Sequence, residues 1–465
     1  MIAVPPISAL LSAASGTPLD GRMKTLRMLY RVGRGPSSSH TMAPARAAGV
    51  FGRAHPDGVA FRVTLYGSMA ATGKGHLTDA AIRDALSPRP VEFVWRADED
   101  LPLHPCGMRF EALDARGRAR DAFDDYSLGG GALASDEPDE DVYELTTMAS
   151  ILRRVRERGE TLWEHVREVE GPDLWEFLGA AWDAMRAAIR RGLDNEGALP
   201  GGLGLPRRAA AFHRKSRTVR AGFRSEARLA AYAYAVAEEN ACGAEVVTAP
   251  TCGSSGVLPA VLHVLEQDLR ARREDVLRAL ATAGLVGNLV KANGSISGAA
   301  VGCQGEIGTA CAMAAAAAAQ LFGGTPPQIE YAAEMGLEHH LGLTCDPVRG
   351  LVQIPCIERN AHAAARALSG ARFALLSDGV HRISFDDAVE VLLETGRALP
   401  LSHRETSGGG LARVYERRLA LAREERLPNP SADPAIRPSG SSSARRSDRR
   451  PGSVGRRQPS RSAAR

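Results

Sequence analysis

The sequence predicts an α+β protein, with a small N-terminal α+β domain followed by a larger, mostly α-helical domain. Three observations predict this class. Segments 61–68 and 91–97 alternate apolar and polar residues in the manner of strands, and segment 76–86 between them has helical spacing. From about residue 150 onward, apolar residues recur at helical spacing. The acidic, irregular stretch SDEPDEDVYELTT (135–147) separates the two patterns, which places the domains at 24–145 and 150–425.

The second domain is predicted from a series of helical segments. An amphipathic run covers 148–169, and apolar residues keep helical spacing in 175–193, 227–241, 274–290, 305–322 and 359–375. The alanine-rich stretch 310–319 is apolar nearly all round, so we expect it in the middle of a helical bundle.

The composition of the chain is that of a globular protein. Its 465 residues are 44% hydrophobic, 24% charged and 5% aromatic. No stretch of roughly 20 apolar residues is free of charge and glycine breaks, so a membrane-spanning role is not expected. The first residues are apolar but lack the basic start of a secretory signal. We therefore expect a cytoplasmic protein with no membrane partner.

Both ends of the chain differ from its body. Residues 1–23 are predicted to be an N-terminal extension outside the first domain. The tail 428–465 is rich in Ser, Arg, Pro and Gly and carries nine arginines against two aspartates, so we expect it to be disordered. A basic tail can contact nucleic acid, but a solvated extension explains it equally well. Nucleic acid is therefore not an expected partner.

The cysteines indicate reduced thiols or metal ligands. There are seven, an odd number spread over a long chain, unlike the dense and even set of a small disulfide scaffold. Cys303, Cys345 and Cys356 share polar surroundings flanked by glycine or proline, with 41 and ten residues between them. These are not the short spacings of a ferredoxin cluster or a zinc ribbon, so spacing alone favours buried structural thiols.

The first informative motif is GRGPSSSHTMAPARAA (33–48). A Gly-Pro turn precedes a polar run and then a helix of small residues. The run consists of Ser37, Ser38, Ser39, His40 and Thr41. Hydroxyl and backbone N–H groups at the start of a helix can form an anion site. A simple capping serine beside an incidental histidine explains the same pattern, and the motif alone leaves both readings open.

The second motif is YGSMAATGKGHLTDAA, which begins at Tyr66 and carries Lys74 and His76 in a glycine-rich loop. A phosphate-binding loop needs a longer spacing and a Ser or Thr after the lysine, where this chain has Gly75. The loop can bind a carboxylate or move a proton. Taken alone, an exposed polar loop is the simpler interpretation.

Five motifs, taken together and in their order along the chain, resemble those of one known protein family. They are GPSSSHT, TGKGH, TAPTCGSSG, KANGSISGAAVGCQGEIG and LTCDPVRGLVQIPCIERNA. The chain closely resembles the bacterial iron–sulfur-dependent L-serine dehydratases (L-serine ammonia-lyases) of the single-chain type, over about residues 26–412. The resemblance implies a beta-type first domain, a helical alpha-type catalytic domain, and conversion of L-serine to pyruvate and ammonia.

The resemblance also implies a site. The alpha-type domain of this family binds a 4Fe-4S cluster, and the matching cysteines are Cys303, Cys345 and Cys356. The histidines of the two polar motifs, His40 and His76, are implied at the active site. We expect the hydroxyl groups of the first motif to hold the substrate carboxylate, with Lys74 close by; they belong to Ser37, Ser38, Ser39 and Thr41. The remaining cysteines, Cys106, Cys242, Cys252 and Cys311, are expected to be structural.

The chemistry of the reaction agrees with this site. Dehydration of serine removes a weakly acidic Cα proton and expels hydroxide, so it needs an electron sink or a Lewis acid. Pyridoxal phosphate would need a lysine imine. None of the four lysines, Lys24, Lys74, Lys215 and Lys291, has a setting typical of that cofactor. We therefore expect no pyridoxal phosphate, an open cluster iron as Lewis acid, and His40 or His76 as base.

One departure from the family concerns the end of the chain. Single-chain members typically end soon after RETSxGGLA with a cysteine that acts as the fourth iron ligand in the resting enzyme. Here RETSGGGLA (404–412) is present, but no cysteine follows Cys356. We expect an active, oxygen-labile enzyme without this gating.

Other functions remain open at this point. A related L-cysteine desulfidase or L-threonine dehydratase would need few changes in sequence. An inactive, serine-binding cluster sensor would keep the cysteines but not the two histidines, so their joint presence favours an enzyme. For a helical bundle of this kind, a homodimer is the expected assembly.

Overall fold

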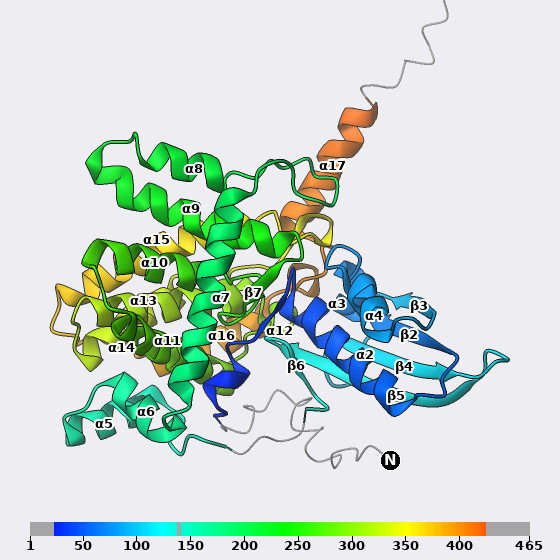
Figure 1. The fold of residues 1–465 in the computed structure, drawn as a ribbon, viewed down its shortest axis with the longest axis horizontal. Coiled ribbons are helices and arrows are strands. Elements are labelled where there is room, and N and C mark those ends of the chain that lie inside the picture. The colour runs from blue at the N-terminus through cyan, green and yellow to red at the C-terminus, as the bar shows by residue number, and fades with distance from the viewer. Residues whose placement is uncertain (1–22, 137–140, 425–465) are drawn as a thin grey trace, which may run out of the picture. The chain divides into compact units, whose positions relative to one another are not determined.

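The computed structural model describes residues 23–136 and 141–424. The predicted tail 428–465 and, except for Met23, the predicted extension 1–23 lie outside the described residues. The chain divides into a compact unit that ends at Arg417 and a second unit that begins at Arg418. The architecture below belongs to the first unit, which holds both the sheet and the helical bundle (Figure 1).

A five-stranded sheet forms the N-terminal part of the fold. Its strand order is β3-β2-β4-β5-β6, with β2 and β3 parallel and the other pairs antiparallel. Helices α2 and α4 pack against the sheet and share its apolar core (Figure 1). The elements up to the end of the sheet are η1 (Leu26–Met28), β1 (Val32–Arg34), η2 (Ser38–Met42), α2 (Ala43–Ala54), β2 (Ala60–Tyr66), α3 (Gly67–Thr72), α4 (Thr78–Leu86), β3 (Val91–Arg96), β4 (Gly107–Leu113), β5 (Ala119–Gly129) and β6 (Ala132–Leu133).

The rest of the described chain is mostly helical, so the predicted fold class is confirmed. Its elements are α5 (Met148–Arg158), α6 (Leu162–Glu170), α7 (Leu174–Asp194), α8 (Ala209–Ser216), α9 (Ala221–Ala241), β7 (Glu245–Val247), α10 (Val257–Leu269), α11 (Arg273–Asn293), α12 (Gly298–Val301), η3 (Gln304–Gly308), α13 (Thr309–Leu321), α14 (Pro326–Glu338), η4 (Val348–Gly350), α15 (Cys356–Leu375), α16 (Phe385–Ala398), η5 (Leu401–His403) and α17 (Gly410–Glu424). None of these helices is long and apolar enough to cross a membrane.

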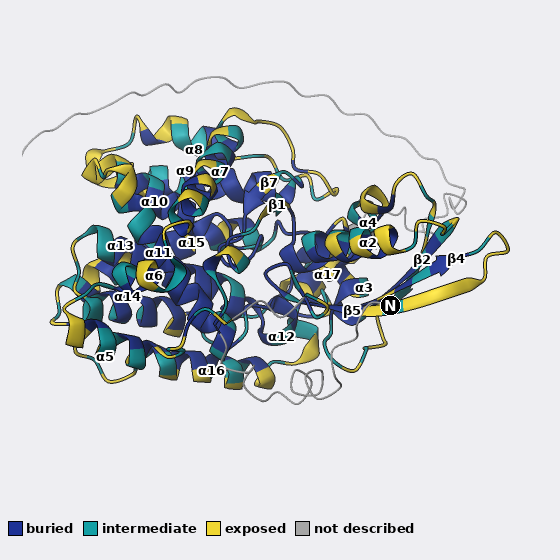
Figure 2. Cartoon of the chain, turned by 60° about the horizontal axis from the view of Figure 1, so that its bottom comes forward, coloured by how far each residue is buried: buried dark blue, intermediate teal, exposed yellow. Residues whose placement is uncertain are grey.

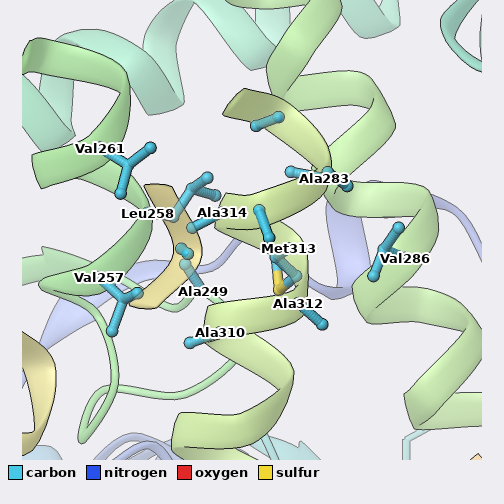
Figure 3. Packing of buried hydrophobic residues seen from close by; sticks show 14 of the residues in the cluster. Ala249, Val257, Leu258, Val261, Ala283, Val286, Ala310, Ala312, Met313 and Ala314 are labelled. Carbon is cyan, nitrogen blue, oxygen red and sulfur yellow. The ribbon is translucent and has the colours of Figure 1, made fainter. Parts of the chain in front are cut away.

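Helix α13 lies at the centre of the bundle, as its alanine-rich sequence predicts. Every residue of the 310–319 stretch is fully buried, and α10, α11, α14 and α15 pack around it. Figure 3 shows Val257 and Val261 of α10 and Val286 of α11 beside the alanines and Met313 of α13. Methyl side chains let neighbouring helices approach closely, which produces a dense core.

Two predicted elements have different boundaries in the structure. The amphipathic run 148–169 is broken into α5 and α6, because Gly159 ends the first helix at φ 67° and Thr161 starts the next with a capping box to Glu164. The predicted strand 61–68 ends at Tyr66, because Gly67 has φ 47° and begins α3. Backbone geometry at these two glycines decides both boundaries.

No segment predicted from the sequence covers the hairpin formed by β4 and β5. Asp114 makes its turn, since its Oδ1 accepts hydrogen bonds from the N–H groups of Arg116 and Arg118, and Gly117 supplies φ 73°. The first half of β5 is exposed on both faces (Figure 2). A strand that is solvated on both sides has no alternating apolar pattern, so the usual signal was absent.

The N-terminal segment packs on the helical bundle before it reaches the sheet. Met23, Leu26 and Tyr30 are buried in the helical core, and β1 pairs antiparallel with β7, with Val32 opposite Val247. The hydroxyl of Tyr30 donates to the carbonyl of Leu280 at 2.9 Å. These contacts fix the residues just before the SSSHT motif onto the bundle, which brings that motif next to the cysteine-bearing loops.

Close packing between α13 and α14 yields a prediction for Gly336. A Cβ at this position would lie 2.7 Å from Cα of Ala312, a backbone atom that cannot move aside alone. We expect Gly336→Ala to lower the free energy of unfolding by about 1–3 kcal/mol, although alanine is the better helix former. Urea denaturation measures the change.

The matched control is Gly370→Ala in α15, where the nearest heavy atom to the new Cβ lies at 3.8 Å. This variant should be as stable as the parent protein or slightly more stable, because only helix propensity changes. Equal stability of both variants would contradict the packing of α13 on α14.

Candidate active site

A buried cavity lies where the sheet region, the helical bundle and the RETSGGG loop meet. The three family-motif cysteines, one of the two histidines and two carboxylates share it. Its lining residues are Pro36, Ser37, His76, Gly253, Cys303, Glu306, Ile307, Cys345, Pro347, Val352, Cys356 and Glu405. Three of them start helices: Ser37 caps η2, Cys303 precedes η3 and Cys356 begins α15. Helix N-termini favour negative charge, so the cavity suits anionic ligand atoms.

His40 is held in the first turn of η2. The Ser37 hydroxyl caps this turn by accepting a hydrogen bond from the backbone N–H of His40 at 3.0 Å. Thr78 donates to the carbonyl of His40 at 2.6 Å. The His40 side chain is fully buried beside the cavity.

His76 is held by the TGKGH loop between α3 and α4. Its backbone N–H and its Nδ1 both contact the carbonyl of Thr72, at 3.1 and 3.0 Å. The Thr41 hydroxyl donates to the carbonyl of His76 at 2.7 Å. A Cβ on Gly75 would lie 2.4 Å from the carbonyl oxygen of Gly350, so only glycine lets this loop pack on the η4 backbone. The two histidine motifs are thus tied to each other.

Hydrogen bonds set which nitrogen of each imidazole carries the proton. A carbonyl only accepts, so Nδ1–H of His76 donates to Thr72 and Nε2 is left as the free acceptor. The Ser68 hydroxyl donates to the carbonyl of Glu405 at 2.8 Å and therefore accepts from Nε2–H of His40 at 3.3 Å. His40 then has its acceptor at Nδ1, which lies 3.5 Å from the Ser37 hydroxyl. The two rings are stacked, with centroids 4.6 Å apart.

Both histidines are neutral in this setting. Burial lowers the pKa of His76 to about 4. Burial, and next the charge that His76 would carry, lower the pKa of His40 well below its ordinary value. Each imidazole therefore offers a lone pair at neutral pH.

The three cysteines of the family motifs come from separate loops. Cys345 lies between α14 and η4, where its thiol and that of Cys303 form a hydrogen bond that, together with burial, raises the pKa of Cys345 well above its ordinary value. Burial raises the pKa of Cys356 in the same direction. All three thiols are free of disulfide bonds and line one cavity, so the structure brings together the residues that the resemblance selected.

Arg359 supplies positive charge to this side of the cavity. It lies one turn after Cys356 in α15 and donates to the carbonyl of Thr344 at 2.7 Å. Burial opposes its charge, yet the pKa of Arg359 is raised above its ordinary value by Cys303, Cys356 and Cys345. A guanidinium here stabilises thiolates, the form in which cysteine binds metal.

Two acidic residues of the cavity are not among the site residues predicted from the sequence. Glu306 accepts hydrogen bonds from the thiols of Cys303 at 3.8 Å and Cys345 at 4.0 Å. Glu405 lies 3.6 Å from Nδ1 of His40 and 3.7 Å from Nε2 of His76. Burial raises the pKa of each carboxyl to about 8, and the next causes are the charge of Glu405 on Glu306 and of Cys303 on Glu405. Their only signal in the sequence was membership of the GCQGEIG and RETSGGG motifs.

Not every predicted site residue lies on the cavity. Ser37 lines it, whereas Ser38, Ser39 and Thr41 are buried behind it in η2. Lys74 is exposed, and its ammonium group lies 5.5 Å from the centre of the Trp95 ring. Lys74 is not among the lining residues, so the cavity does not bring it together with the cysteines.

The other four cysteines are not among the lining residues. Cys311 lies in the core of α13, and its thiol contacts the carbonyl of Ala363 at 3.3 Å. Cys252 is buried 3.8 Å from the sulfur of Met42. Cys242 is half-buried and contacts the guanidinium of Arg207 at 3.0 Å. Cys106 is fully buried in the core of the sheet region.

Comparisons with known proteins agree with these motifs. The family model of the serine dehydratase alpha chain matches residues 144–412, and that of the serine dehydratase beta chain matches residues 26–91. The L-serine dehydratase of Streptomyces coelicolor is 42% identical, over 83% of this chain and 97% of that protein.

Similar relatives occur in other bacteria. L-serine dehydratase 2 of Escherichia coli is 38% identical, over 83% of this chain and 97% of its own length. The L-serine dehydratase of Helicobacter pylori is 32% identical, over 83% of this chain and 98% of that protein. Because both parts of the family match in order and these relatives align over almost their whole length, the chain belongs to the serine dehydratase family.

Proposed function

We propose that this protein is an L-serine dehydratase that converts L-serine to pyruvate and ammonia. The observation that carries the proposal is the cavity itself. In a chain of this family, one cavity gathers three free cysteines, a neutral histidine with a free Nε2, and two carboxylates. Metal ligands, a base and polar anchors for an amino acid are thereby next to one another.

The donor set of the cavity suits an iron–sulfur cluster. Soft thiolate ligands select such clusters, and a site of three thiols leaves one iron for an outside ligand. Cys303, Cys345 and Cys356 would hold the 4Fe-4S cluster, with Arg359 offsetting part of the negative charge. When bound, the cluster would supply Lewis-acid chemistry at the leaving hydroxyl group.

We assign His76 as the general base. Its Nδ1–H is fixed on the carbonyl of Thr72, and its Nε2 is free and belongs to a side chain that lines the cavity. Nε2 takes the Cα proton, and the electron pair of the Cα–H bond forms the Cα–Cβ double bond. The Cβ–O bond breaks with its electron pair on oxygen, and the hydroxide takes the proton back from Nε2 and leaves as water. His40 does not line the cavity and positions His76 by stacking on it.

The start of η2 is our candidate for binding the substrate carboxylate. Ser37 lines the cavity at the N-terminus of this helical turn, where an anion is favoured. The products follow from ordinary chemistry. Loss of water leaves 2-aminoacrylate, which tautomerises to an imine, and water hydrolyses the imine to pyruvate and ammonia.

Anaerobic purification tests the proposed function. We expect the protein to contain iron and sulfide, to absorb visible light, and to release pyruvate from L-serine. Both the absorbance and the activity should fall after exposure to air, because a cluster with an open iron is sensitive to oxygen. L-threonine, tested at the same concentration, would give 2-oxobutanoate and measures substrate preference.

A colourless protein that takes up no iron during reconstitution and releases no pyruvate would contradict the proposal. Cluster absorbance without turnover would instead support a serine-binding sensor. Faster release of 2-oxobutanoate than of pyruvate would make L-threonine the better substrate.

A further inference from the structure

Glu405 occupies an unusual position in the fold. It belongs to the loop formed by residues 401–410, here named the strap. Its N–H donates to the carbonyl of Cys345 at 2.7 Å, and the N–H of Cys345 donates to the carbonyl of His403 at 2.8 Å. Ser68 donates to the carbonyl of Glu405 at 2.8 Å. Glu405 has φ 55°, a left-handed conformation that a non-glycine residue keeps only where its surroundings impose it.

The carboxylate of Glu405 has no cationic partner of its own. Its side chain is 7% exposed and lies within 3.7 Å of His40 and His76. Both imidazoles are neutral at pH 7, because burial lowers their pKa values. Among residues 23–136 and 141–424, no lysine or arginine forms an ion pair with Glu405. Glu405 lines the cavity, so a cationic ligand group there would pair with its carboxyl group and favour the carboxylate form.

We propose that Glu405 binds the α-ammonium group of the substrate, and this inference rests on the proposed function. The ammonium group and the proton to be removed are attached to the same carbon atom. An ammonium group on Glu405 therefore brings the Cα–H bond next to Nε2 of His76, 3.7 Å from the Glu405 carboxylate.

The neighbouring carboxylate is engaged elsewhere. Oε2 of Glu306 lies 3.8 Å from Sγ of Cys303 and 4.0 Å from Sγ of Cys345, on the side of the cavity proposed for the cluster. The three substrate groups then have separate places. The hydroxyl group faces the cysteines, the carboxylate lies at the start of η2, and the ammonium group lies on Glu405. Glu405 thereby selects amino acids over hydroxy acids of the same shape.

The test compares L-serine with L-glycerate, in which a hydroxyl group replaces the ammonium group. We expect Glu405→Gln in the anaerobic holoenzyme to raise KM for L-serine by at least roughly 30-fold, since a charge-assisted bond is lost. The inhibition constant of L-glycerate should change by less than about threefold, because the side-chain carbonyl of glutamine can still accept a hydrogen bond from its hydroxyl group. Glu405→Asp should recover part of the affinity for L-serine.

The control variant is Glu416→Gln, which removes a surface carboxylate that pairs with Arg349 at 2.8 Å. It should leave both constants unchanged. Iron content is measured for every variant, because collapse of the strap would lower it and would weaken both ligands together.

Several outcomes would overturn the inference. If Glu405→Gln raised KM for L-serine and the inhibition constant of L-glycerate by the same factor, Glu405 would have a structural role. Unchanged constants would exclude contact with the substrate. A selective loss of L-serine in Glu306→Gln but not in Glu405→Gln would move the ammonium site to Glu306. Failure of the proposed function is a separate result, since the unmodified holoenzyme would then release no pyruvate.

Discussion

Replacing Cys345 by alanine is expected to remove the bound iron and to lower pyruvate formation by at least about 1,000-fold. The thiol of Cys345 lies in the cavity with those of Cys303 and Cys356, and the loss of one of three ligands leaves the cluster without adequate support. The Lewis-acid contribution to expelling hydroxide, worth several kcal/mol, is then lost. Iron and sulfide assays, visible absorbance and pyruvate release measure the effect.

Cys311→Ala is the matched control for this prediction. Its thiol is fully buried in α13 and contacts a backbone carbonyl, so the substitution should cost about 1 kcal/mol of stability but no iron. If Cys345→Ala keeps its iron and its absorbance, Cys345 is not a ligand. If Cys311→Ala also loses iron, the assay reports loss of folding rather than loss of a ligand.

The parts of the fold that depend on local pattern were predictable. The alanine-rich stretch was placed in the middle of the bundle because it has no polar face, and α13 is fully buried there. Helices α7 and α9 follow the predicted segments 175–193 and 227–241, because their apolar residues keep helical spacing. The β4–β5 hairpin was missed, because half of β5 has no buried face.

The carboxylates of the candidate site could not be found from local pattern. Glu405 reaches the cavity because the strap pairs with the Cys345 loop, in a parallel bridge between Cys345 and Arg404. This contact joins residues that are far apart in the sequence, and the bridge is only one residue long on each side. The cysteines were found only because long motifs resembled a family, since their spacing favoured structural thiols.

Lys74 is a predicted site residue that does not line the cavity. It is adjacent to Gly75 and two residues from His76, so the sequence placed it near the substrate. The loop turns between them: His76 is 1% exposed, whereas Lys74 is exposed and faces Trp95. Nearness in a tight loop does not fix the side to which a side chain points. We therefore give Lys74 no role in the proposed reaction.

His76→Asn is expected to lower kcat by roughly 100- to 10,000-fold, the contribution typical of a general base. The asparagine amide can still donate to the carbonyl of Thr72, as Nδ1–H does, so the loop is preserved while Nε2 is removed. Iron content should stay unchanged, and KM should change by less than about threefold, since His76 contributes to the transition state rather than to binding. Steady-state kinetics on L-serine and on L-serine deuterated at Cα provide the measurement, with a larger isotope effect expected in the variant.

The comparison variant is His40→Gln, whose amide can keep the hydrogen bond to Ser68 while Nδ1 is removed. Because His40 positions His76 and does not line the cavity, we expect His40→Gln to lower kcat less than His76→Asn does, by about 10- to 100-fold. If His40→Gln lowered kcat more than His76→Asn, His40 would be the general base and His76 the positioning residue.

The pH dependence of kcat gives an independent check on His76. A base must be unprotonated, so activity is lost as the pH falls through its pKa. Burial lowers the pKa of His76 to about 4, and the imidazole therefore stays neutral from pH 8 down to pH 6. At saturating L-serine, we therefore expect kcat not to fall as the pH is lowered through 6.5. The parent enzyme could instead lose activity near pH 6.5 while His76→Asn does not. That result would mean that the His76 imidazole titrates like an exposed histidine, which is incompatible with its burial beneath the strap.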